Sequence, residues 1–527
     1  MYLKARIILL CIIAGSFTTS LVAQKIKVTW GDNSRLNYDF DDAIPLRNGN
    51  YLILKLKNTT ASIFSRPVSE PSLVLVNSNM VTLKEAAIQI DEREAELKGL
   101  EKYGDNIFFI YNSYDRKSKV TSVYALRIDE KTLLSKGKVT LGNFESDSRD
   151  DQAEPTYKLS ADSSKILLFV EGPERKKENK KYFVGVYDTD LKNIWLRNIE
   201  LPIGDRYVSI YDEDITNDGK VFVAIKHYDK EVTRQMVREE GEKVPSYTYK
   251  LLKYAEGQSK AQEISFNLND NFIQGTKLVY NNNGTITAAG LYKRKYNGNI
   301  TGVFYATFDG SATEVKDPTM VAFPGDMLTL VDKDNFGTDS KSDAGLYPHF
   351  KVNYILNRTN GSVDLISEYY RLVISSSYNS QTKTYSTRRI YYYGDIVNVN
   401  LGKDGTATFT RVPKNQKMQE VDIFLGYFPI IYKDKLVLLY NDDEDNIDRD
   451  LSKAPDDMMR FKKSVFAAAT IDAKGNLTRQ TIYSHRDEDY VSMPRYTSRI
   501  SDSRYLITSD LLKLFKKRTR FGILEIK

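Results

Sequence analysis

The feature that most constrains this sequence is a repeated pattern of short apolar segments separated by polar turns. Segments 51–57 (YLILKLK), 106–111 (NIFFIY) and 435–440 (KLVLLY) are rich in aromatic and β-branched residues and are bounded by turn formers. Such segments are typical of β-strands. Glycines follow polar residues in the intervening turns, as at Asn48-Gly49 and Asn283-Gly284, and glycine adopts the positive φ that tight hairpins require. The chain is therefore predicted to be all-β.

The predicted strands group into similar units of about four strands. Each unit has a first strand, a turn, a strongly apolar strand, a polar hairpin and further strands, as 158–202 and 208–266 show. Residues 83–103 contain good helix formers, but their apolar residues do not continue as a helical stripe, so this stretch is predicted as strand–turn–strand. The predicted units are 38–94, 95–145, 155–203, 205–268, 271–324, 346–413, 420–485 and 490–527.

The two ends of the chain complement each other. The last unit supplies about three strands, while Lys25–Trp30 forms a strand without a unit of its own. If that strand completes the last sheet, the units close into a ring and no terminal strand edge stays exposed. We therefore predict a single β-propeller domain over 24–527 with eight four-stranded blades. Seven blades remain an alternative because 325–345 looks like an irregular loop, and two smaller β domains or stacked sandwiches are the other architectures considered.

The first 23 residues have the pattern of a secretory signal peptide. Lys4 and Arg6 precede an apolar run at 7–15, and Ala23 ends a stretch of small residues. The run is shorter than a bilayer needs, and no second apolar stretch approaches that length. Leu9 and Leu10 precede Cys11, which does not fit lipid attachment. We predict cleavage after Ala23, with Ser20 as the alternative, and an exported protein that is periplasmic or secreted and does not span a membrane.

Composition removes several classes of function. The 527 residues carry 76 Lys+Arg against 70 Asp+Glu, a formal charge of +6 that is too weak to indicate nucleic-acid binding. One cysteine excludes a disulfide scaffold, and three histidines leave little material for a His-ligated metal site. No Gly-x-Ser-x-Gly elbow and no phosphate-binding glycine loop occurs. A prolyl-peptidase type of propeller enzyme is therefore not expected, and no nucleic-acid partner is predicted.

Two acidic segments raise the question of calcium. The loop 441–457 holds eight carboxylates, but they lack a regular ligand spacing, so a solvated hairpin tip is the favoured interpretation. Asp214–Gly219 resembles the start of a calcium loop, but the twelfth position is Ile225 rather than Glu, which indicates an ordinary turn. No cofactor is predicted, with calcium left open. His485 is interpreted as a solvent-exposed loop residue.

The best candidates for a binding site cluster in the second half of the chain. Glu368 follows an apolar strand, and we expect it to pair with Arg371 or Lys414 rather than to act in catalysis. Aromatic side chains at 391–393 are suited to stacking on a sugar or a peptide, although strand alternation places at least one of the three in the core. The candidate binding residues are Glu368, Tyr369, Arg371, Tyr391, Tyr393 and Lys414.

Several motifs between 354 and 443 resemble a known family. Residues 354–370 contain a Gly-Ser turn that leads to a Glu-aromatic strand, and 391–400 follow after a polar insert. Residues 411–416 contain Pro-Lys-x-Gln, and 435–443 end an apolar strand with Asn-Asp. Together they resemble a family of uncharacterised, exported bacterial β-propeller-like proteins, with a departure at Tyr440, where the family has Phe. The resemblance implies fold and compartment but no activity.

The sequence therefore favours a non-enzymatic binding or scaffold protein of a Gram-negative cell envelope, whose partner is a protein or a glycan. The alternative is a carbohydrate-active or other hydrolytic propeller with carboxylates in its central funnel. A hydrolase should bring at least two acids and one Arg or His together around the central channel. Burial of Glu368 in an isolated salt bridge would argue against a catalytic role for that residue.

Overall fold

The structure is a computed structural model of the chain. It describes residues 25–31, 34–35, 38–46, 48–58, 69–92, 95–146, 155–175, 178–228, 236–239, 242–315, 318–333, 336–338, 343–381, 383–511 and 518–527. The predicted signal peptide and Cys11 lie outside these residues. Most of the described chain is in β-strands, and eight of its sheets have four or more strands.

The first four sheets follow one another along the chain, and each begins with its innermost strand. Their strands pair antiparallel with their neighbours in sequence, except for the short strand that adds to sheet 4. Sheet 1 contains β3 (Tyr38–Pro45), β4 (Tyr51–Asn58), β5 (Ser69–Val76) and β6 (Thr82–Ala87). Sheet 2 contains β7 (Ala95–Tyr103), β8 (Asn106–Asp115), β9 (Val120–Ile128) and β10 (Ser135–Glu145). Sheet 3 contains β11 (Pro155–Leu159), β12 (Ile166–Glu171), β13 (Asn179–Tyr187) and β14 (Asn193–Gly204). Sheet 4 contains β15 (Val208–Ile215), β16 (Val221–Tyr228), β19 (Tyr247–Tyr254) and β20 (Gln262–Phe266), and β24 (Glu314–Val315) pairs parallel to β20.

The other four sheets repeat this order. Sheet 5 contains β21 (Phe272–Tyr280), β22 (Thr285–Lys293), β23 (Gly302–Asp309) and β25 (Thr319–Ala322). Sheet 6 contains β28 (Phe350–Asn357), β29 (Val363–Asn379), β30 (Thr384–Leu401), β31 (Ala407–Val412) and β32 (Gln416–Gln419). Sheet 7 contains β33 (Tyr427–Tyr432), β34 (Lys435–Asp443), β35 (Ser464–Ile471) and β36 (Leu477–Ser484). Sheet 8 contains β37 (Tyr490–Ser492), β38 (Ser498–Ser501), β39 (Arg504–Leu511), β40 (Arg518–Ile526), β1 (Ile26–Trp30) and β2 (Ser34–Arg35). The hairpins β17 (Met236–Glu239)–β18 (Glu242–Pro245) and β26 (Gly337–Thr338)–β27 (Gly345–Leu346) are separate. These sheets match the predicted units closely, including strands at both ends of 83–103.

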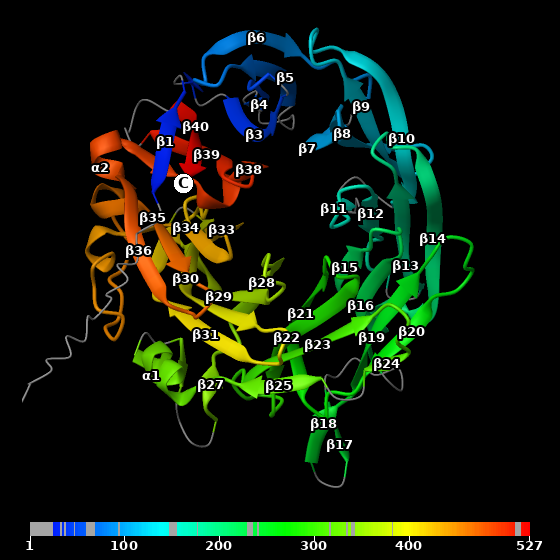
Figure 1. Cartoon of the computed structure of the whole chain (residues 1–527), viewed down its shortest axis with the longest axis vertical. Helices are drawn as coiled ribbons and strands as arrows, with labels where there is room; N and C mark the ends of the chain where they lie inside the picture. The colour runs from blue at the N-terminus through cyan, green and yellow to red at the C-terminus, as the bar shows by residue number, and fades with distance from the viewer. Residues whose placement is uncertain are drawn as a thin grey trace, which may run out of the picture.

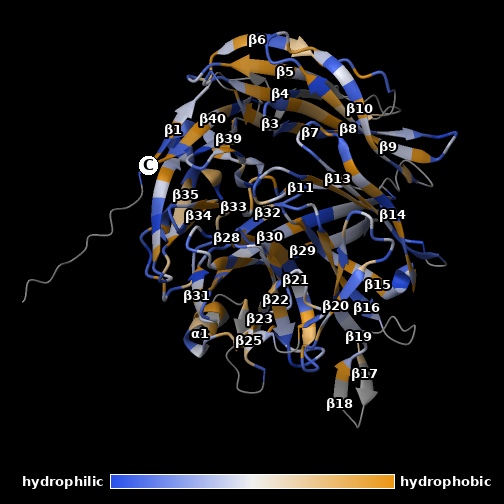
Figure 2. Cartoon of the chain, turned by 45° about the vertical axis from the view of Figure 1, so that its right-hand side comes forward, coloured by the Kyte–Doolittle hydropathy of each residue, from blue (hydrophilic) through white to orange (hydrophobic). Residues whose placement is uncertain are grey.

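The sheets are arranged around a common centre in chain order, with first strands such as β7, β11, β15 and β28 nearest to it (Figure 1). Hydrophobic stretches run along strands such as β4 and β5 (Figure 2). Eight clusters of buried apolar side chains each draw residues from two consecutive sheets. One of them joins sheet 8 to sheet 1, where Ile53 and Val74 meet Leu506 and Ile523. This radial arrangement of antiparallel sheets is that of a β-propeller.

The strand that follows the predicted signal peptide pairs with the last strand of the chain. β1 runs antiparallel to β40, with Val28 opposite Leu524 and Trp30 opposite Gly522. The guanidinium carbon of Arg520 lies 3.7 Å from the ring centroid of Trp30, a cation–π contact that adds to the strand pairing. The two ends of the chain thus share sheet 8.

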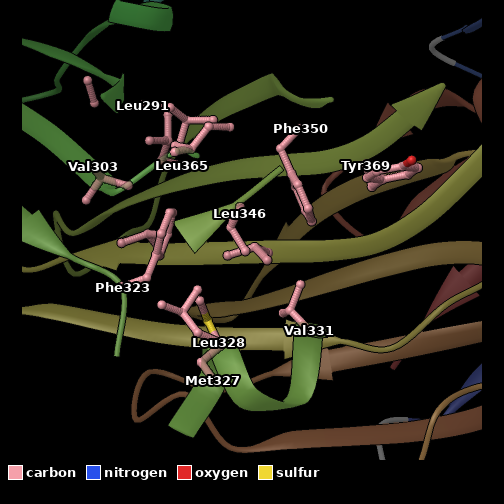
Figure 3. Close-up of a cluster of buried hydrophobic side chains, with 14 of the residues drawn as sticks. Leu291, Val303, Phe323, Met327, Leu328, Val331, Leu346, Phe350, Leu365 and Tyr369 are labelled. Carbon is pink, nitrogen blue, oxygen red and sulfur yellow. The ribbon is translucent and has the colours of Figure 1, made fainter. Parts of the chain in front are cut away.

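The stretch 325–345 differs from the loop that the sequence indicates. Residues Gly325–Lys333 form helix α1. The buried side chains of Met327, Leu328 and Val331 pack from this helix into the cluster between sheets 5 and 6, where they meet Phe323 and Leu346 (Figure 3). This apolar face stabilises the helix through tertiary packing, although its flanking residues are loop-like. Within the described residues, the helices are too short to traverse a lipid bilayer.

Candidate functional site: a projecting ribbon above a buried polar network

Strands β29 and β30 are much longer than the others. They have 17 and 18 residues, whereas no other described strand exceeds 12. They pair with each other to Asn379↔Thr384, but β28 pairs with β29 only as far as Tyr369, and β32 pairs with β30 only over 390–393. Residues 371–379 and 384–389 therefore form a two-stranded projection, which we call the ribbon.

A β-bulge lies at the base of the ribbon. The register changes between Glu368↔Ile396 and Tyr370↔Tyr393, so two residues of β30, Gly394 and Asp395, stand opposite the single residue Tyr369 of β29. The Tyr369 ring packs on Phe336, with a centroid distance of 4.4 Å, and against Phe350 (Figure 3). Tyr369, which the sequence suggested as a binding residue, is therefore part of the core between sheets 5 and 6.

The bulge places Glu368 beside Lys414. Lys414 Nζ lies 2.7 Å from Glu368 Oε1 and 3.1 Å from Gln416 Oε1, and all three side chains are buried. Gln416 in turn donates from Nε2 to the backbone oxygen of Asn441 at 2.6 Å. The Glu-aromatic, Pro-Lys-x-Gln and Asn-Asp motifs, which are far apart in the sequence, thus meet at one place. Of the two partners predicted for Glu368, Lys414 is the one observed.

Further charged groups extend this contact into a network. Arg411 Nε lies 2.6 Å from Asp395 Oδ2, and the backbone N–H of Lys414 donates to Asp395 Oδ1 at 3.0 Å. Asn446 donates to Asp442 Oδ1 at 2.7 Å. We call this set the buried polar network; its members are Glu368, Asp395, Arg411, Lys414, Gln416, Asn441 and Asp442.

Burial controls the electrostatics of the network, because removing a carboxylate from water disfavours its charged form. It raises the pKa of Glu368, against the opposing effect of Lys414. It raises the pKa of Asp395 well above its usual range and that of Asp442 to about 7. These carboxylates face protein groups rather than solvent, so Glu368 is placed to hold the base of the ribbon and not to attack a substrate.

A partly exposed rim covers the network. Tyr393 donates from its hydroxyl to Asp422 Oδ2 at 2.7 Å, and Arg495 Nη2 lies 2.8 Å from the same carboxylate oxygen. The rings of Tyr370 and Tyr393 meet edge to face at 5.0 Å, and the Arg495 guanidinium lies 5.4 Å from the Tyr393 centroid. Burial and the hydrogen bond to Asp422 raise the pKa of Tyr393. Tyr393 thus links the network below it to the surface.

One face of the ribbon continues outward from this rim. Side chains alternate along a strand, so Tyr370, Leu372, Ile374 and Tyr378 share a face. Their cross-strand partners on β30 include Tyr393, Tyr391 and Tyr385. We call these residues the aromatic face: Tyr370, Leu372, Ile374, Tyr378, Tyr385, Tyr391 and Tyr393.

The outer part of the aromatic face is open to solvent. Ile374, Tyr378 and Tyr385 are 58%, 54% and 77% exposed, and the two tyrosine rings lie 4.9 Å apart. Near the base, Tyr370 and Tyr391 are half-buried against a small cluster around Leu425. Ser376 and Thr387 lie between Ile374 and the tyrosine pair, and Arg389 stands opposite Ile374, so the exposed face combines aromatic and apolar groups with polar ones. Several exposed apolar groups on one face are typical of an interaction site, whereas single exposed apolar residues are not.

The opposite face of the ribbon is basic. Arg371 lies beside Tyr369 and projects away from the face that carries Tyr370, so it is not the partner of Glu368. Arg388, opposite Ser375, is on the same side. Residues 371–394 contain no Asp or Glu, and their four basic residues are Arg371, Lys383, Arg388 and Arg389. Arg389 is opposite Ile374 and therefore lies on the aromatic face.

His485 differs from the solvent-exposed histidine that the sequence indicates. It begins the short helix α2 (His485–Glu488), and its side chain is buried. Its Nδ1 lies 2.7 Å from Ser464 Oγ on β35, and its ring meets that of Tyr483 edge to face. Burial lowers the pKa of His485 to about 3, so the imidazole is neutral at physiological pH.

The acidic loop 441–457 is only partly a solvated tip. Asp442 and Asp443 belong to β34 and are buried. Asp443, Asp445 and Asp456 have carboxylate oxygens within 4.8 Å of one another, an arrangement that a cation could occupy. Arg449 forms an ion pair with Asp456, however, and Asp443 accepts the backbone N–H of Asp445. Protein groups therefore already contact two of the three carboxylates, those of Asp443 and Asp456.

A second charged cluster lies on first strands near the centre, and sequence reasoning missed it. Asp212 Oδ1 on β15 lies 3.1 Å from Lys158 Nζ on β11 and 3.2 Å from Lys277 Nζ on β21. Burial raises the pKa of the neighbouring Asp214 to about 6. The cluster links sheets 3, 4 and 5, because Asp212 pairs with one lysine side chain from each of the two neighbouring sheets. Three successive acids inside a predicted strand, 212–214, were the signal that could have found it.

Other residues of the site were also missed. Asp395 stands between the aromatic run 391–393 and the apolar pair Ile396-Val397, and a carboxylate in such a place is buried only when it is paired, so it could have been identified. Asp422 lies in the loop after β32 and Arg495 in the short 3-10 helix Pro494–Tyr496, 73 residues away in the sequence. No local pattern connects them, and only the packing of sheets 6, 7 and 8 brings them to Tyr393.

Comparisons with known proteins identify no family. No protein-family model matches the chain, and no curated protein matches it. Solved structures that resemble it include the β-propeller domain of the Trilobed protease from Pyrococcus furiosus, with a TM-score of 0.35 and 12% identity, covering 86% of this chain and 98% of that one.

Two further structures have similar scores. The WD40 domain of SCAP from fission yeast has a TM-score of 0.39 and 8% identity, covering 95% of this chain and 94% of that one. The acylaminoacyl peptidase of Pyrococcus horikoshii has a TM-score of 0.36 and 9% identity, covering 92% of this chain and 60% of the peptidase. The chain thus spans less than two thirds of the peptidase, and likeness at these scores carries no information on activity.

Proposed function

We propose that this chain is an exported binding protein of a bacterial cell envelope, in which a closed, eight-bladed propeller carries a binding surface for a protein or a glycan on sheet 6. The pattern of 1–23 supports export to the periplasm or beyond, and the resemblance over 354–443 supports the same compartment. The alternative of a hydrolase gains no support from Glu368, whose carboxylate is buried against Lys414.

The proposal of a closed ring of eight blades is supported by three observations. Eight sheets of the described chain have four or more strands. Eight apolar clusters join each sheet to the next, including sheet 8 to sheet 1. β1 pairs with β40, which leaves both ends of the chain in one sheet. A ring of this kind is a rigid support for loops and projections that bind ligands.

The observation that carries the binding proposal is the aromatic face. It is exposed where it projects from the sheet, and its base is fixed by Tyr393 and the buried polar network. A rigid base lowers the entropy lost on binding, and exposed tyrosines supply large contact areas with few rotatable bonds. The face therefore suits a ligand held by stacking and apolar contact.

The experiment is affinity capture from the envelope fraction of the native bacterium. The wild type should retain a partner that the triple variant Ile374→Ser/Tyr378→Ser/Tyr385→Ser loses. Ser375→Ala/Ser377→Ala, on the other face of the ribbon, is the matched control and should retain it. Equal capture by the wild type and the triple variant would contradict the proposed surface. Recovery of the protein in the cytoplasm with residues 1–23 attached would contradict export.

A further inference from the structure

The outer edge of β29 has unpaired backbone groups along the ribbon. The N–H of Tyr370 donates to the backbone oxygen of His349 at 3.1 Å, so the polar groups of Tyr370 face the side on which β28 lies. In an antiparallel sheet these groups alternate between the two sides of a strand. The N–H and C=O groups of Leu372, Ile374, Ser376 and Tyr378 therefore face that side too, where no described strand pairs with them.

An edge of this kind needs an explanation, because proteins usually protect exposed edges. Proline, a bulge or an inward-pointing charge would prevent another strand from adding. Residues 371–379 contain no proline, and their pairing with β30 has no bulge beyond Tyr370. The middle of the edge is Ser375-Ser376-Ser377, whose small side chains leave the backbone accessible. The edge is thus regular over nine residues and open to an added strand.

Charge decides which strand fits. The four bases and the lack of acids in 371–394 give the ribbon a positive charge. Two ribbons placed edge to edge would bring these charges together, which disfavours a second copy of the chain as occupant. The carboxylates of an added strand would lie beside Arg371 on the basic face, with Arg388 one strand further in, while its apolar side chains would lie beside Leu372 and Ile374 on the other face, where Arg389 stands opposite Ile374.

We infer that the edge of β29 at 371–379 accepts a β-strand from an acidic partner protein, in which apolar residues alternate with Asp or Glu. This inference rests on the proposed function and names the partner class for the same site. The strand would hydrogen-bond to the outward backbone groups of Leu372, Ile374, Ser376 and Tyr378. Backbone pairing would supply affinity, and the two faces of the ribbon would select the alternating pattern.

The test uses the mature protein and a fluorescein-labelled peptide of alternating valine and glutamate, followed by fluorescence anisotropy. Ser376→Pro removes one outward N–H and the contact of the Ser376 hydroxyl with Thr387, while the backbone ladder to β30 stays in place. We expect binding to weaken at least tenfold with Ser376→Pro and to change less than twofold with Ser376→Ala, which also loses the hydroxyl but keeps the N–H. A valine–lysine peptide should not bind. Circular dichroism and thermal unfolding establish that both variants are folded.

Each other outcome is informative. Unchanged binding by Ser376→Pro, together with loss in Ile374→Ser/Tyr378→Ser/Tyr385→Ser, would overturn strand addition and leave the proposed binding face standing. Unchanged binding by both variants would overturn strand addition and the proposed surface together. No binding of the valine–glutamate peptide by the wild type would overturn the inference, and so would a dimer in sedimentation that Ser376→Pro dissociates, because a second copy would then occupy the edge.

Discussion

Lys414 Nζ lies 2.7 Å from Glu368 Oε1, and neither side chain reaches solvent. The two residues are 46 positions apart in the sequence, one on β29 and the other between β31 and β32. Their contact fixes the bulge from which the ribbon projects. The geometry of the aromatic face therefore depends on an ion pair that is buried beneath it.

Removal of one partner of this pair should be more harmful than removal of both. Lys414→Met leaves a buried carboxylate without its cation, and breaking a buried pair in this way costs about 3–5 kcal/mol. The double variant Glu368→Leu/Lys414→Met should recover much of that loss, because no uncompensated charge remains. Urea unfolding monitored by tryptophan fluorescence measures both. A Lys414→Met variant within about 1 kcal/mol of the wild type would contradict this account.

Asp442 should make the protein less stable as pH rises from about 4 to 7. Its pKa is raised to about 7 in the folded chain, mainly by burial, from about 3.9 when unfolded. Between these values the folded state binds more protons than the unfolded state, so the free energy of unfolding falls with rising pH. Asp442→Asn should remove this contribution, so its stability relative to the wild type should be higher at pH 7.5 than at pH 4.5. A difference that is constant across pH would contradict the raised pKa.

His485 should have the opposite effect. Its pKa is lowered to about 3 by burial, against about 6.5 in the unfolded chain. The unfolded state binds the extra proton between these values, so this contribution is complete above pH 6.5 and is lost as pH falls towards 3. His485→Gln should therefore lose less stability than the wild type between pH 7 and pH 5. NMR should show the His485 ring neutral down to pH 4.5; titration near pH 6.5 would contradict its burial.

A disulfide should link the two ends of the chain across sheet 8. Lys27 lies opposite Glu525 in the β1–β40 pair, and cross-strand neighbours lie within the Cα separation that disulfides span. Cys11 is the only cysteine, and it precedes the predicted cleavage site. Lys27→Cys/Glu525→Cys should oxidise within one chain and raise stability by about 2–4 kcal/mol, lost again on reduction. Lys27→Cys/Lys192→Cys, whose second site is in the turn between β13 and β14 of sheet 3, should not. Failure of the first pair to form would argue against the β1–β40 pairing.

The boundaries of the sheets could be predicted from sequence because their causes are local. Alternating apolar residues define a strand, and residues such as Gly49 and Gly284, with φ of 77° and 86°, define hairpins. Helix α1 was missed for a related reason. Its apolar residues Met327, Leu328 and Val331 are few, and the helix becomes favourable only when sheets 5 and 6 supply a surface to cover.

The candidate site was predicted only in part. Glu368, Lys414 and Tyr393 were singled out and do lie together, whereas Tyr369 and Arg371 lie on the opposite face of β29. Alternation along β29 alone accounts for that difference. On β30 the bulge at Gly394-Asp395 shifts the alternation and turns Tyr393 to the side of Glu368. A glycine inside a strand is a signal for a bulge, but which residues the bulge brings together depends on the neighbouring sheets. The burial of His485 was likewise invisible, because it depends on the packing of α2 against β35.

By itself, the sequence determined that this protein is built from strands in repeated units and that its second half carries unusual polar and aromatic motifs. Those properties follow from side-chain periodicity and turn chemistry, which act over a few residues. Only the tertiary structure decided which motif residues meet, which carboxylates lose their water, and which edge of β29 remains open. These depend on how one sheet packs against the next, and that packing joins residues that are distant in the chain.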